Sequence, residues 1–270
     1  MPARPLLFAA SLEWGLIFVG LALLWRFVVS PAARAQPPRS QLAEWPIALP
    51  DFVRFLLVLV CCSLIANLGA TLLMKVRPLA GGPKDIFFTA CWHAGMLSGI
   101  AVFKFLVERV PLAQASLRVG DVVTGVATLL IALPFVTAVS LAWRWLLGLA
   151  GVELDHQHLV DIFVHAKSPV LLGLMIVLAA VTAPLMEEMV FRAGFFRYLR
   201  TRVPRWGALL VPAVLFGALH QNIASFAPLV VLGVIFSLAY ERTGRIATTI
   251  VAHGLFNLLA ILLVFAGVGV

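Results

Sequence analysis

The sequence predicts an all-α protein, a polytopic transmembrane helical bundle with about eight spans. Hydrophobic residues make up 62% of the 270 residues and charged residues only 12%, whereas a soluble domain carries about twice that charged fraction. The mean hydropathy is +1.05. Apolar runs long enough to cross a bilayer as helices, which takes about 20 residues, recur between short polar loops. These features predict a multi-pass integral membrane protein.

The loops divide the chain into eight expected helices. The first apolar run is too long for the h-region of a cleaved signal peptide, which has about 7–15 residues, so we interpret it as a retained transmembrane helix. The expected spans are residues 6–29, 52–74, 86–107, 122–149, 169–198, 206–221, 228–240 and 246–265.

Two parts of the chain differ in what they carry. Residues 1–150 hold the first four helices and no motif that indicates chemistry. Residues 151–270 hold the remaining helices and three polar motifs, at 187–192, 216–220 and 253–257, which we interpret as a catalytic core. A polar tract at 155–158 could resemble a metal site, but its spacing fits no tetrahedral set, and we interpret it as a solvated loop.

The net charge of +8 does not indicate a nucleic-acid partner, because the basic residues lie in short inter-helix loops. Their placement is the one expected for orientation in a membrane. The densest basic cluster follows the fifth helix at 197–205, and a second basic turn lies at 242–245. Positive-inside logic predicts that both face the cytosol.

The most informative stretch is the pair of carboxylates Glu187 and Glu188, followed by Arg192, in the fifth helix. Charged groups inside a span are costly unless they are paired or face water. On a helix Glu188 and Arg192 are one turn apart and can pair. Glu187 lies about 100° around the axis from its neighbour and is left to point elsewhere.

Further polar residues occupy the two helices that would lie beside this stretch. At 1.5 Å per residue, Glu187 and His220 each lie roughly 23 Å from the turn that joins their helices. His253 lies about 12 Å from its own turn, and the arginine-rich end of the fifth helix, which would extend beyond the membrane, would absorb the difference. Asn257 follows His253 by one turn. We therefore expect these residues to meet at one depth, buried but nearer the cytosolic side.

A carboxylate and two imidazoles in a dry site suit the attack of water on an amide. A glutamate can take the proton of the water and return it to the leaving amine. The imidazoles could bind a divalent metal such as zinc or act on the oxyanion, and an Asn amide could hold a substrate carbonyl or the water. Spacing alone leaves both the metal-dependent and the metal-free mechanism open.

Three motifs resemble those of the CPBP family of intramembrane proteases, which contains type II CAAX prenyl endopeptidases and bacteriocin-processing or Abi proteins. They are Glu187-Glu188-x-x-x-Arg192, Phe216-x-x-x-His220 and His253-x-x-x-Asn257. The resemblance covers about a third of the chain, from 169 to 262. The chain departs from it at Ala193, where the family usually has glycine.

The resemblance implies an intramembrane, glutamate-dependent endopeptidase of metalloprotease-like type with an all-helical core. By the family pattern Glu187 would be the general base, and Glu188 with Arg192 would hold the site. His220, His253 and Asn257 would bind a metal, with the two histidines as candidate zinc ligands, or would bind the water and the oxyanion. The substrate would be a peptide or membrane protein, lipidated if the CAAX activity applies, reached from the lipid bilayer.

Two other functions remain as alternatives at this point. A membrane scaffold or immunity protein that retains the fold would tolerate the loss of Glu187. A proton-coupled transporter would use the carboxylates as a relay, but it would also predict inverted repeats with broken helices, and the sequence shows none.

Overall fold

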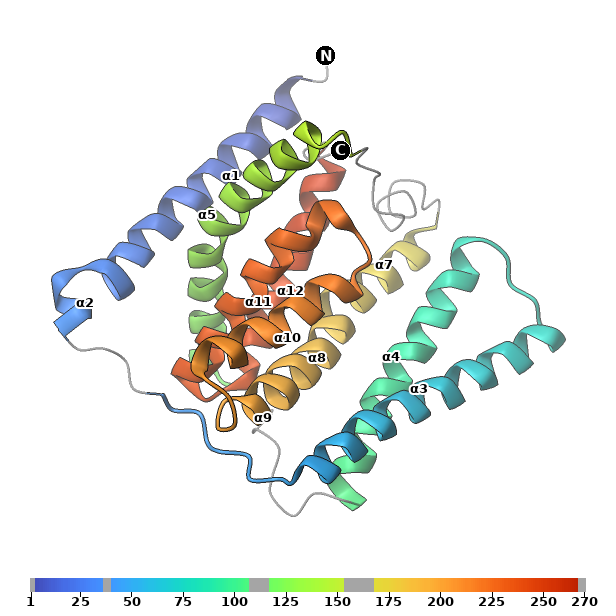
Figure 1. Cartoon of the computed structure of the whole chain (residues 1–270). Helices are drawn as coiled ribbons and strands as arrows, with labels where there is room; N and C mark the ends of the chain where they lie inside the picture. The colour runs from blue at the N-terminus through green and yellow to red at the C-terminus, as the bar shows by residue number, and fades with distance from the viewer. Residues whose placement is uncertain (1–2, 36–39, 107–116, 153–167, 267–270) are drawn as a thin grey trace.

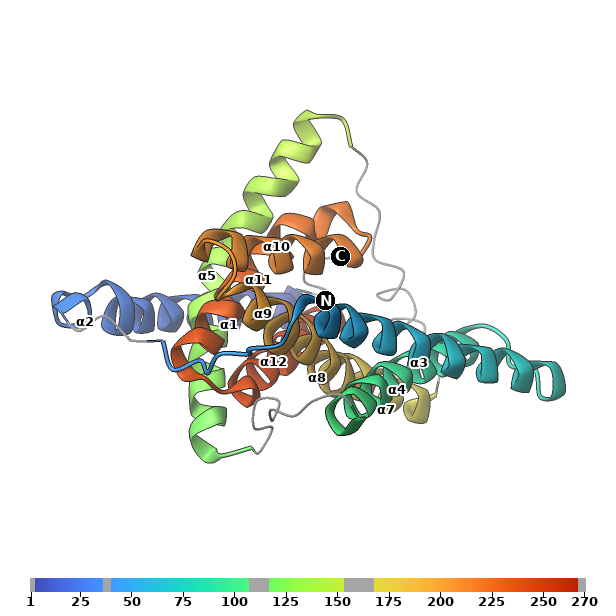
Figure 2. The same cartoon turned by 60° about the horizontal axis from the view of Figure 1, so that its bottom comes forward.

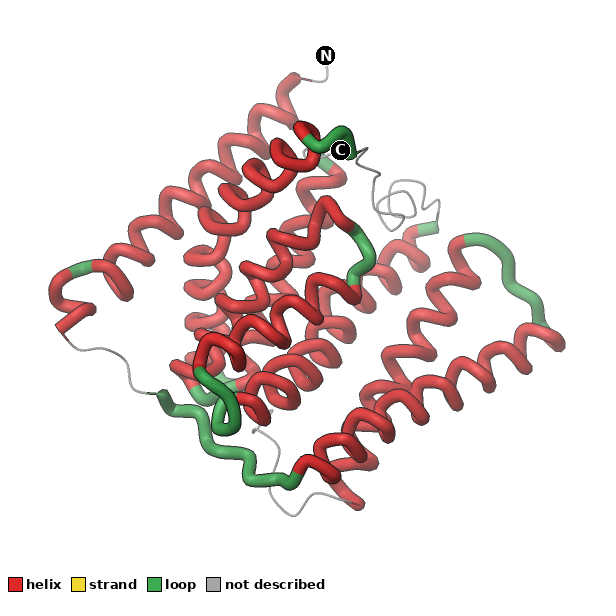
Figure 3. The backbone as a smooth tube through the Cα atoms, in the orientation of Figure 1, coloured by secondary structure: helices red, strands yellow, loops and turns green. Residues whose placement is uncertain are grey.

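The computed structural model describes residues 3–35, 40–106, 117–152 and 168–266, and the described chain is helical with no strand (Figure 3). The helices of the first half are α1 (Ala3–Leu24), the π-helix η1 (Trp25–Val29), α2 (Pro31–Ala35), α3 (Leu49–Val76), α4 (Gly82–Leu106) and α5 (Val119–Leu149). The helices of the second half are α7 (Pro169–Val177), η2 (Leu178–Thr182), α8 (Ala183–Glu188), η3 (Met189–Phe196), α9 (Arg197–Leu199), α10 (Arg205–Leu219), α11 (Ile223–Thr243) and α12 (Ile246–Phe265).

Within the described residues, seven helices are long and apolar enough to cross a membrane, which fits a multi-pass integral membrane protein. The continuous run from α7 to α9 counts as one of them. The sixth expected span, at 206–221, differs from the other seven, because α10 has only 15 residues. At 1.5 Å per residue it is about 22 Å long, shorter than the roughly 30 Å of a hydrocarbon core. The tract at 155–158 lies outside the described residues.

The helices form two groups (Figures 1 and 2). The first group is built around α5, which packs against α1, α11 and α12, while α12 in turn packs against η2 and α8. The second group is the α3–α4 hairpin, held together tightly because Gly95 and Gly99 let the two backbones approach. A Cβ at Gly95 would lie 2.5 Å from the Cα of Ser63. This close approach of small residues is typical of helix pairs in membranes.

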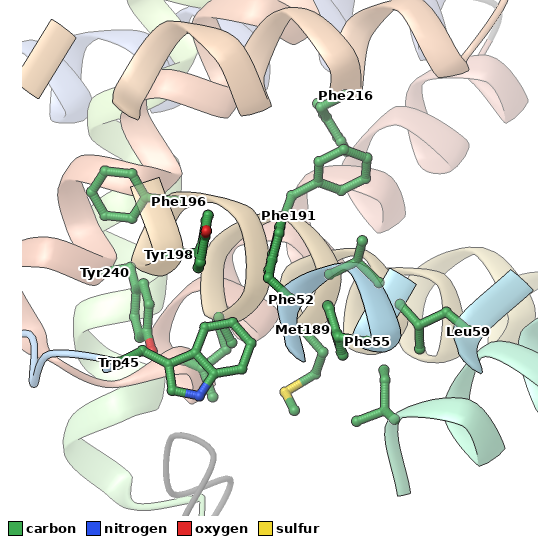
Figure 4. Packing of buried hydrophobic residues seen from close by; sticks show 14 of the residues in the cluster. Trp45, Phe52, Phe55, Leu59, Met189, Phe191, Phe196, Tyr198, Phe216 and Tyr240 are labelled. Atoms are coloured by element: carbon green, nitrogen blue, oxygen red, sulfur yellow. The ribbon is translucent and has the colours of Figure 1, made fainter. Parts of the chain in front are cut away.

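A buried aromatic cluster joins the hairpin to the end of the carboxylate helix (Figure 4). Phe52 of α3 stacks on Tyr198 of α9 with ring centroids 3.9 Å apart, and Phe55 fills the space beside Gly194. Trp45, fully buried, packs edge-on against Phe52 and Phe55. The cluster therefore fixes one end of the hairpin against the helix that carries the glutamates.

The same end of the bundle is crossed by an extended segment, residues 40–48, which we call the strap. Its backbone is held at Gln41, whose N–H donates to the carbonyl of Glu241 at 3.0 Å. Gly244, with φ of 63°, ends α11 beside it. A Cβ at Gly244 would lie 2.5 Å from the Gln41 carbonyl oxygen, so both the positive φ and the close approach require glycine there.

The two basic turns lie together at this end. Glu241 forms ion pairs with Arg200 and, at 2.8 Å, with Arg205. Arg245 pairs with Asp121 of α5, and this carboxylate raises the pKa of the arginine through a direct hydrogen bond. Their common location agrees with the expectation that both turns face one side of the membrane; that this side is the cytosol stays a prediction.

Candidate active site

The carboxylate helix is interrupted on both sides of the glutamates. The six-residue α8, which carries Glu187 and Glu188, lies between two π-helical segments, η2 before it and η3 after it. π-Helical segments inside longer helices occur often at functional sites. The π-helical pattern changes which backbone N–H groups and carbonyls pair just before the glutamates. Pro184 adds to this change because it has no N–H to donate.

Glu188 is the centre of the site, with no exposed surface. Its Oε1 lies 2.9 Å from Nη1 of Arg192 and 2.9 Å from Nδ1 of His253. The sequence-predicted pairing of Glu188 with Arg192 is therefore present in the structure, and one carboxylate oxygen serves two helices. Removing it would leave the charge of Arg192, which is 1% exposed, without its partner.

Arg192 is held more by charge and by aromatic rings than by aligned hydrogen bonds. Its guanidinium carbon lies 4.6 Å from the ring centre of Phe216 and 5.4 Å from that of Phe236. Among the described residues neither its Nη1 nor its Nη2 has a hydrogen-bond partner, and the same is true of Oε2 of Glu188. The cation–π contacts stabilise a buried cation whose ion pair is not aligned as a fork.

Glu187 differs from its neighbour in both exposure and partners. Its side chain is 18% exposed, and its Oε2 lies 3.5 Å from Nε2 of His253. His253 thus stands between the two glutamates, with one ring nitrogen toward each. Because an ionised carboxylate can only accept, Nδ1 of His253 donates to Glu188, and Nε2 is the ring nitrogen that faces Glu187.

His220 ends α10 and is exposed, unlike the buried His253. Its Nδ1 lies 2.7 Å from the carbonyl oxygen of Phe216. A carbonyl can only accept, so Nδ1 carries the proton and the lone pair of the neutral ring is on Nε2. His220 and His253 both pack edge-on against the Phe216 ring, at 4.8 and 5.7 Å between ring centroids. The three motifs are therefore brought to one place.

Asn257 has a different partner from the one that sequence reasoning suggested. Its Nδ2 donates to the carbonyl oxygen of Ala179 at 2.8 Å. In η2 the N–H of Ala183 donates to Leu178 instead of to Ala179, and Pro184 has no N–H that could reach Ala179. Asn257 therefore satisfies a backbone carbonyl that the π-helix and the proline leave open.

Comparison with known proteins agrees with this geometry. Residues 169–259 match the family model described as Type II CAAX prenyl endopeptidase Rce1-like. This segment is similar to the Rce1-like family. The resemblance predicted from the three motifs is thus confirmed, and it runs from α7 into α12, the helices that carry the site.

Two curated relatives each match about a third of the chain. The chain is 28% identical over 90 residues to the "Putative membrane peptidase YdiL" of Bacillus subtilis (strain 168), covering 33% of this chain and 37% of that protein. It is 30% identical over 87 residues to the "UPF0177 protein YbdI" of Lactococcus lactis subsp. lactis (strain IL1403), covering 32% of this chain and 46% of that protein. The matches span less than half the length of either relative. No solved structure matches significantly.

The donor atoms of the Rce1-like segment fit a metal only in part. His220 and His253 give their Nδ1 protons to a carbonyl and a carboxylate, which is how metal-binding histidines are usually oriented. However, within the described residues no group of three or more His, Cys, Asp or Glu side chains is arranged to hold a metal ion. The orientation of the two histidine rings fits such an ion, whereas the arrangement of the described His, Cys, Asp and Glu side chains does not.

Sequence reasoning missed three contributors to this site. Phe236 of α11 contacts both Arg192 and His253, but a phenylalanine in an apolar span gives no signal. Nδ1 of His93 in α4 lies 2.8 Å from the hydroxyl of Thr182. That hydroxyl donates to the carbonyl oxygen of Leu178. Gly254 lets α12 approach the carboxylate helix, because a Cβ there would lie 2.5 Å from the carbonyl oxygen of Ala180.

We predict that Gly254→Ala lowers the thermal midpoint of the protein in detergent. The new methyl group meets a backbone oxygen, so α12 must move away from η2, and overpacking of this kind costs about 1–3 kcal/mol. Gly173→Ala is the matched control, since Gly173 also lies in a helix of this segment and a Cβ there meets nothing within 4 Å. Equal midpoints for the two variants would contradict the close approach.

Proposed function

We propose that this protein is an intramembrane endopeptidase in which Glu187 activates water for attack on a peptide bond. The observation that carries the proposal is the unequal burial of the two carboxylates. Glu188 is fully buried and committed to Arg192 and His253, whereas Glu187 is partly exposed and contacts only the Nε2 side of His253. The Rce1-like match supports peptidase chemistry.

In the proposed reaction a carboxylate oxygen of Glu187 takes a proton from the water as the water oxygen bonds to the carbonyl carbon of the substrate. Nε2 of His253, 3.5 Å away, can share that proton while the tetrahedral intermediate exists. The proton then passes to the amine nitrogen as the C–N bond breaks, so Glu187 returns to its starting state. Nε2 of His220, which bears a lone pair, would orient the water by accepting a hydrogen bond from its other O–H group.

Glu188, Arg192 and Asn257 act as positioning residues in this proposal. Glu188 fixes the ring of His253 through Nδ1, and Arg192 keeps Glu188 in place. Asn257 holds the open carbonyl of Ala179, which steadies the backbone just before the glutamates. None of the three needs to contact the substrate.

The description of the matched family, Type II CAAX prenyl endopeptidase, makes a prenylated peptide the first substrate class to test. A bacteriocin-maturation or immunity role would use other peptides on the same site. A scaffold that merely retains the fold would give no turnover on any of them.

We predict that Glu187→Gln abolishes turnover and leaves the fold intact, because glutamine keeps the shape but cannot take the proton. Loss of a general base lowers the rate by about 10²–10⁴-fold. The assay is cleavage of a farnesylated CAAX peptide by protein reconstituted in liposomes, supported by comparison of peptide termini in membranes that contain the wild type or the variant.

Glu13→Gln is the matched control, since it makes the same chemical change in α1, which contacts α5 and not the site. Wild-type turnover by Glu13→Gln with loss in Glu187→Gln supports the proposal. Residual activity of Glu187→Gln above about a tenth of wild type would remove Glu187 from the role of general base.

A second prediction concerns the metal. Glu187 cannot be both a metal ligand and a free base, which leaves two imidazoles and an amide, a weak ligand set for zinc. We therefore expect turnover to survive exhaustive chelation, with metal content measured on the same samples. Stoichiometric zinc whose removal and restoration track activity would contradict this and would make His220 and His253 ligands.

A further inference from the structure

Arg197 is a buried cation without a carboxylate partner. It is 4% exposed, and its Nε and Nη2 donate to the strap carbonyls of Ala43 at 2.8 Å and Glu44 at 3.0 Å. Its Nη1 has no hydrogen-bond partner among the described residues, and no ion pair of Arg197 is found there. Leaving a buried charge uncompensated is costly, so this arrangement favours binding of an anion.

A cavity of about 230 Å³ adjoins this guanidinium between the strap and the end of the carboxylate helix. Arg197 and Arg200 line it together with the hydroxyl-bearing residues Ser40 and Thr201. Glu44 lines it as well, but this residue is exposed and its carbonyl is already held by Arg197. Arg200 is already paired with Glu241, and the Ser40 hydroxyl donates to the Glu241 carbonyl. Among the described lining residues, Arg197 is therefore the cation without an ion pair, and guanidinium groups suit phosphate oxygens.

The location of the cavity indicates where such a phosphate comes from. Arg197 lies two residues before the end of the span 169–199, α3 begins at Leu49 directly after the strap, and α11 ends at Thr243 beside it. Three membrane-spanning helices thus end around the cavity, which places it at the membrane surface. Basic pockets between helices at this level are suited to the headgroups of anionic lipids.

We propose that the cavity binds the phosphate of an anionic lipid headgroup, with the charge of the Arg197 guanidinium as the principal attraction. The bound lipid would hold the strap against the carboxylate helix, since Arg197 contacts the strap backbone and the cavity at once. This site is separate from the three motifs and does not depend on the proposed peptidase activity.

The test uses full-length protein purified in a non-ionic detergent, stripped of lipid and titrated with phosphatidylglycerol, with bound lipid counted by native mass spectrometry. Arg197→Gln should weaken the tightest phosphatidylglycerol site by about tenfold or more, the effect of losing a charge-assisted contact. Arg242→Gln is the matched control, because Arg242 is exposed at the same end and does not line the cavity. It should bind as the wild type does.

Two further measurements keep the proposal open to refutation. Arg197→Lys serves as the test if Arg197→Gln fails to fold. It keeps the charge but loses the guanidinium fork, so we expect it to bind the lipid more weakly than the wild type does. Sodium phosphate at the same concentrations, compared with sodium chloride of equal ionic strength, should not displace the lipid. Unchanged binding by the Arg197 variants, or displacement by inorganic phosphate as effective as the lipid itself, would overturn the proposal.

Discussion

One buried carboxylate holds the site together. Glu188 contacts Arg192 along its own helix and His253 on α12, and both contacts use the same oxygen at 2.9 Å. In surroundings without water, each of these groups would be costly alone. Because Glu188 compensates Arg192 and orients His253, the neighbouring Glu187 can remain partly exposed and available to react. The two adjacent glutamates thus differ in role because only one of them is paired with an arginine.

The backbone around Glu187 and Glu188 shows how the helix is kept in position. The π-helix η2 and Pro184 together leave the Ala179 carbonyl open, and Asn257 closes it from α12. Gly254 lets the two helices approach at the next turn. His93 reaches the same stretch from α4 through Thr182. Three contacts from two helices therefore fix the segment that precedes the glutamates.

Much of this arrangement was predictable, because it depends on local spacing or on the depth of a residue along its helix. The i, i+4 spacing of Glu188 and Arg192 predicts their pairing, and the rise per residue predicts that His220 and His253 approach Glu187. The motifs also predict the family. Long apolar runs predict the spanning helices, apart from α10, which has nearly the expected length but is too short to count as a span.

The rest depends on how helices pack, which periodicity does not determine. No spacing rule indicates that His253 lies between both glutamates or that Asn257 bonds to the backbone of another helix. No sequence motif indicates that the strap carbonyls accept hydrogen bonds from Arg197. Such contacts join residues more than 60 positions apart, and only the folded arrangement shows them.

The central claim is that Glu188 and Arg192 form one energetic unit, and a double-mutant cycle tests it most directly. The free energy of unfolding would be measured in mixed micelles for Glu188→Gln, Arg192→Met and the double variant. We expect each single change to cost about 3–5 kcal/mol, because it leaves a buried polar partner uncompensated, and the double variant to cost less than the sum by about 1–3 kcal/mol. Single effects that add to within about 0.5 kcal/mol would contradict the account.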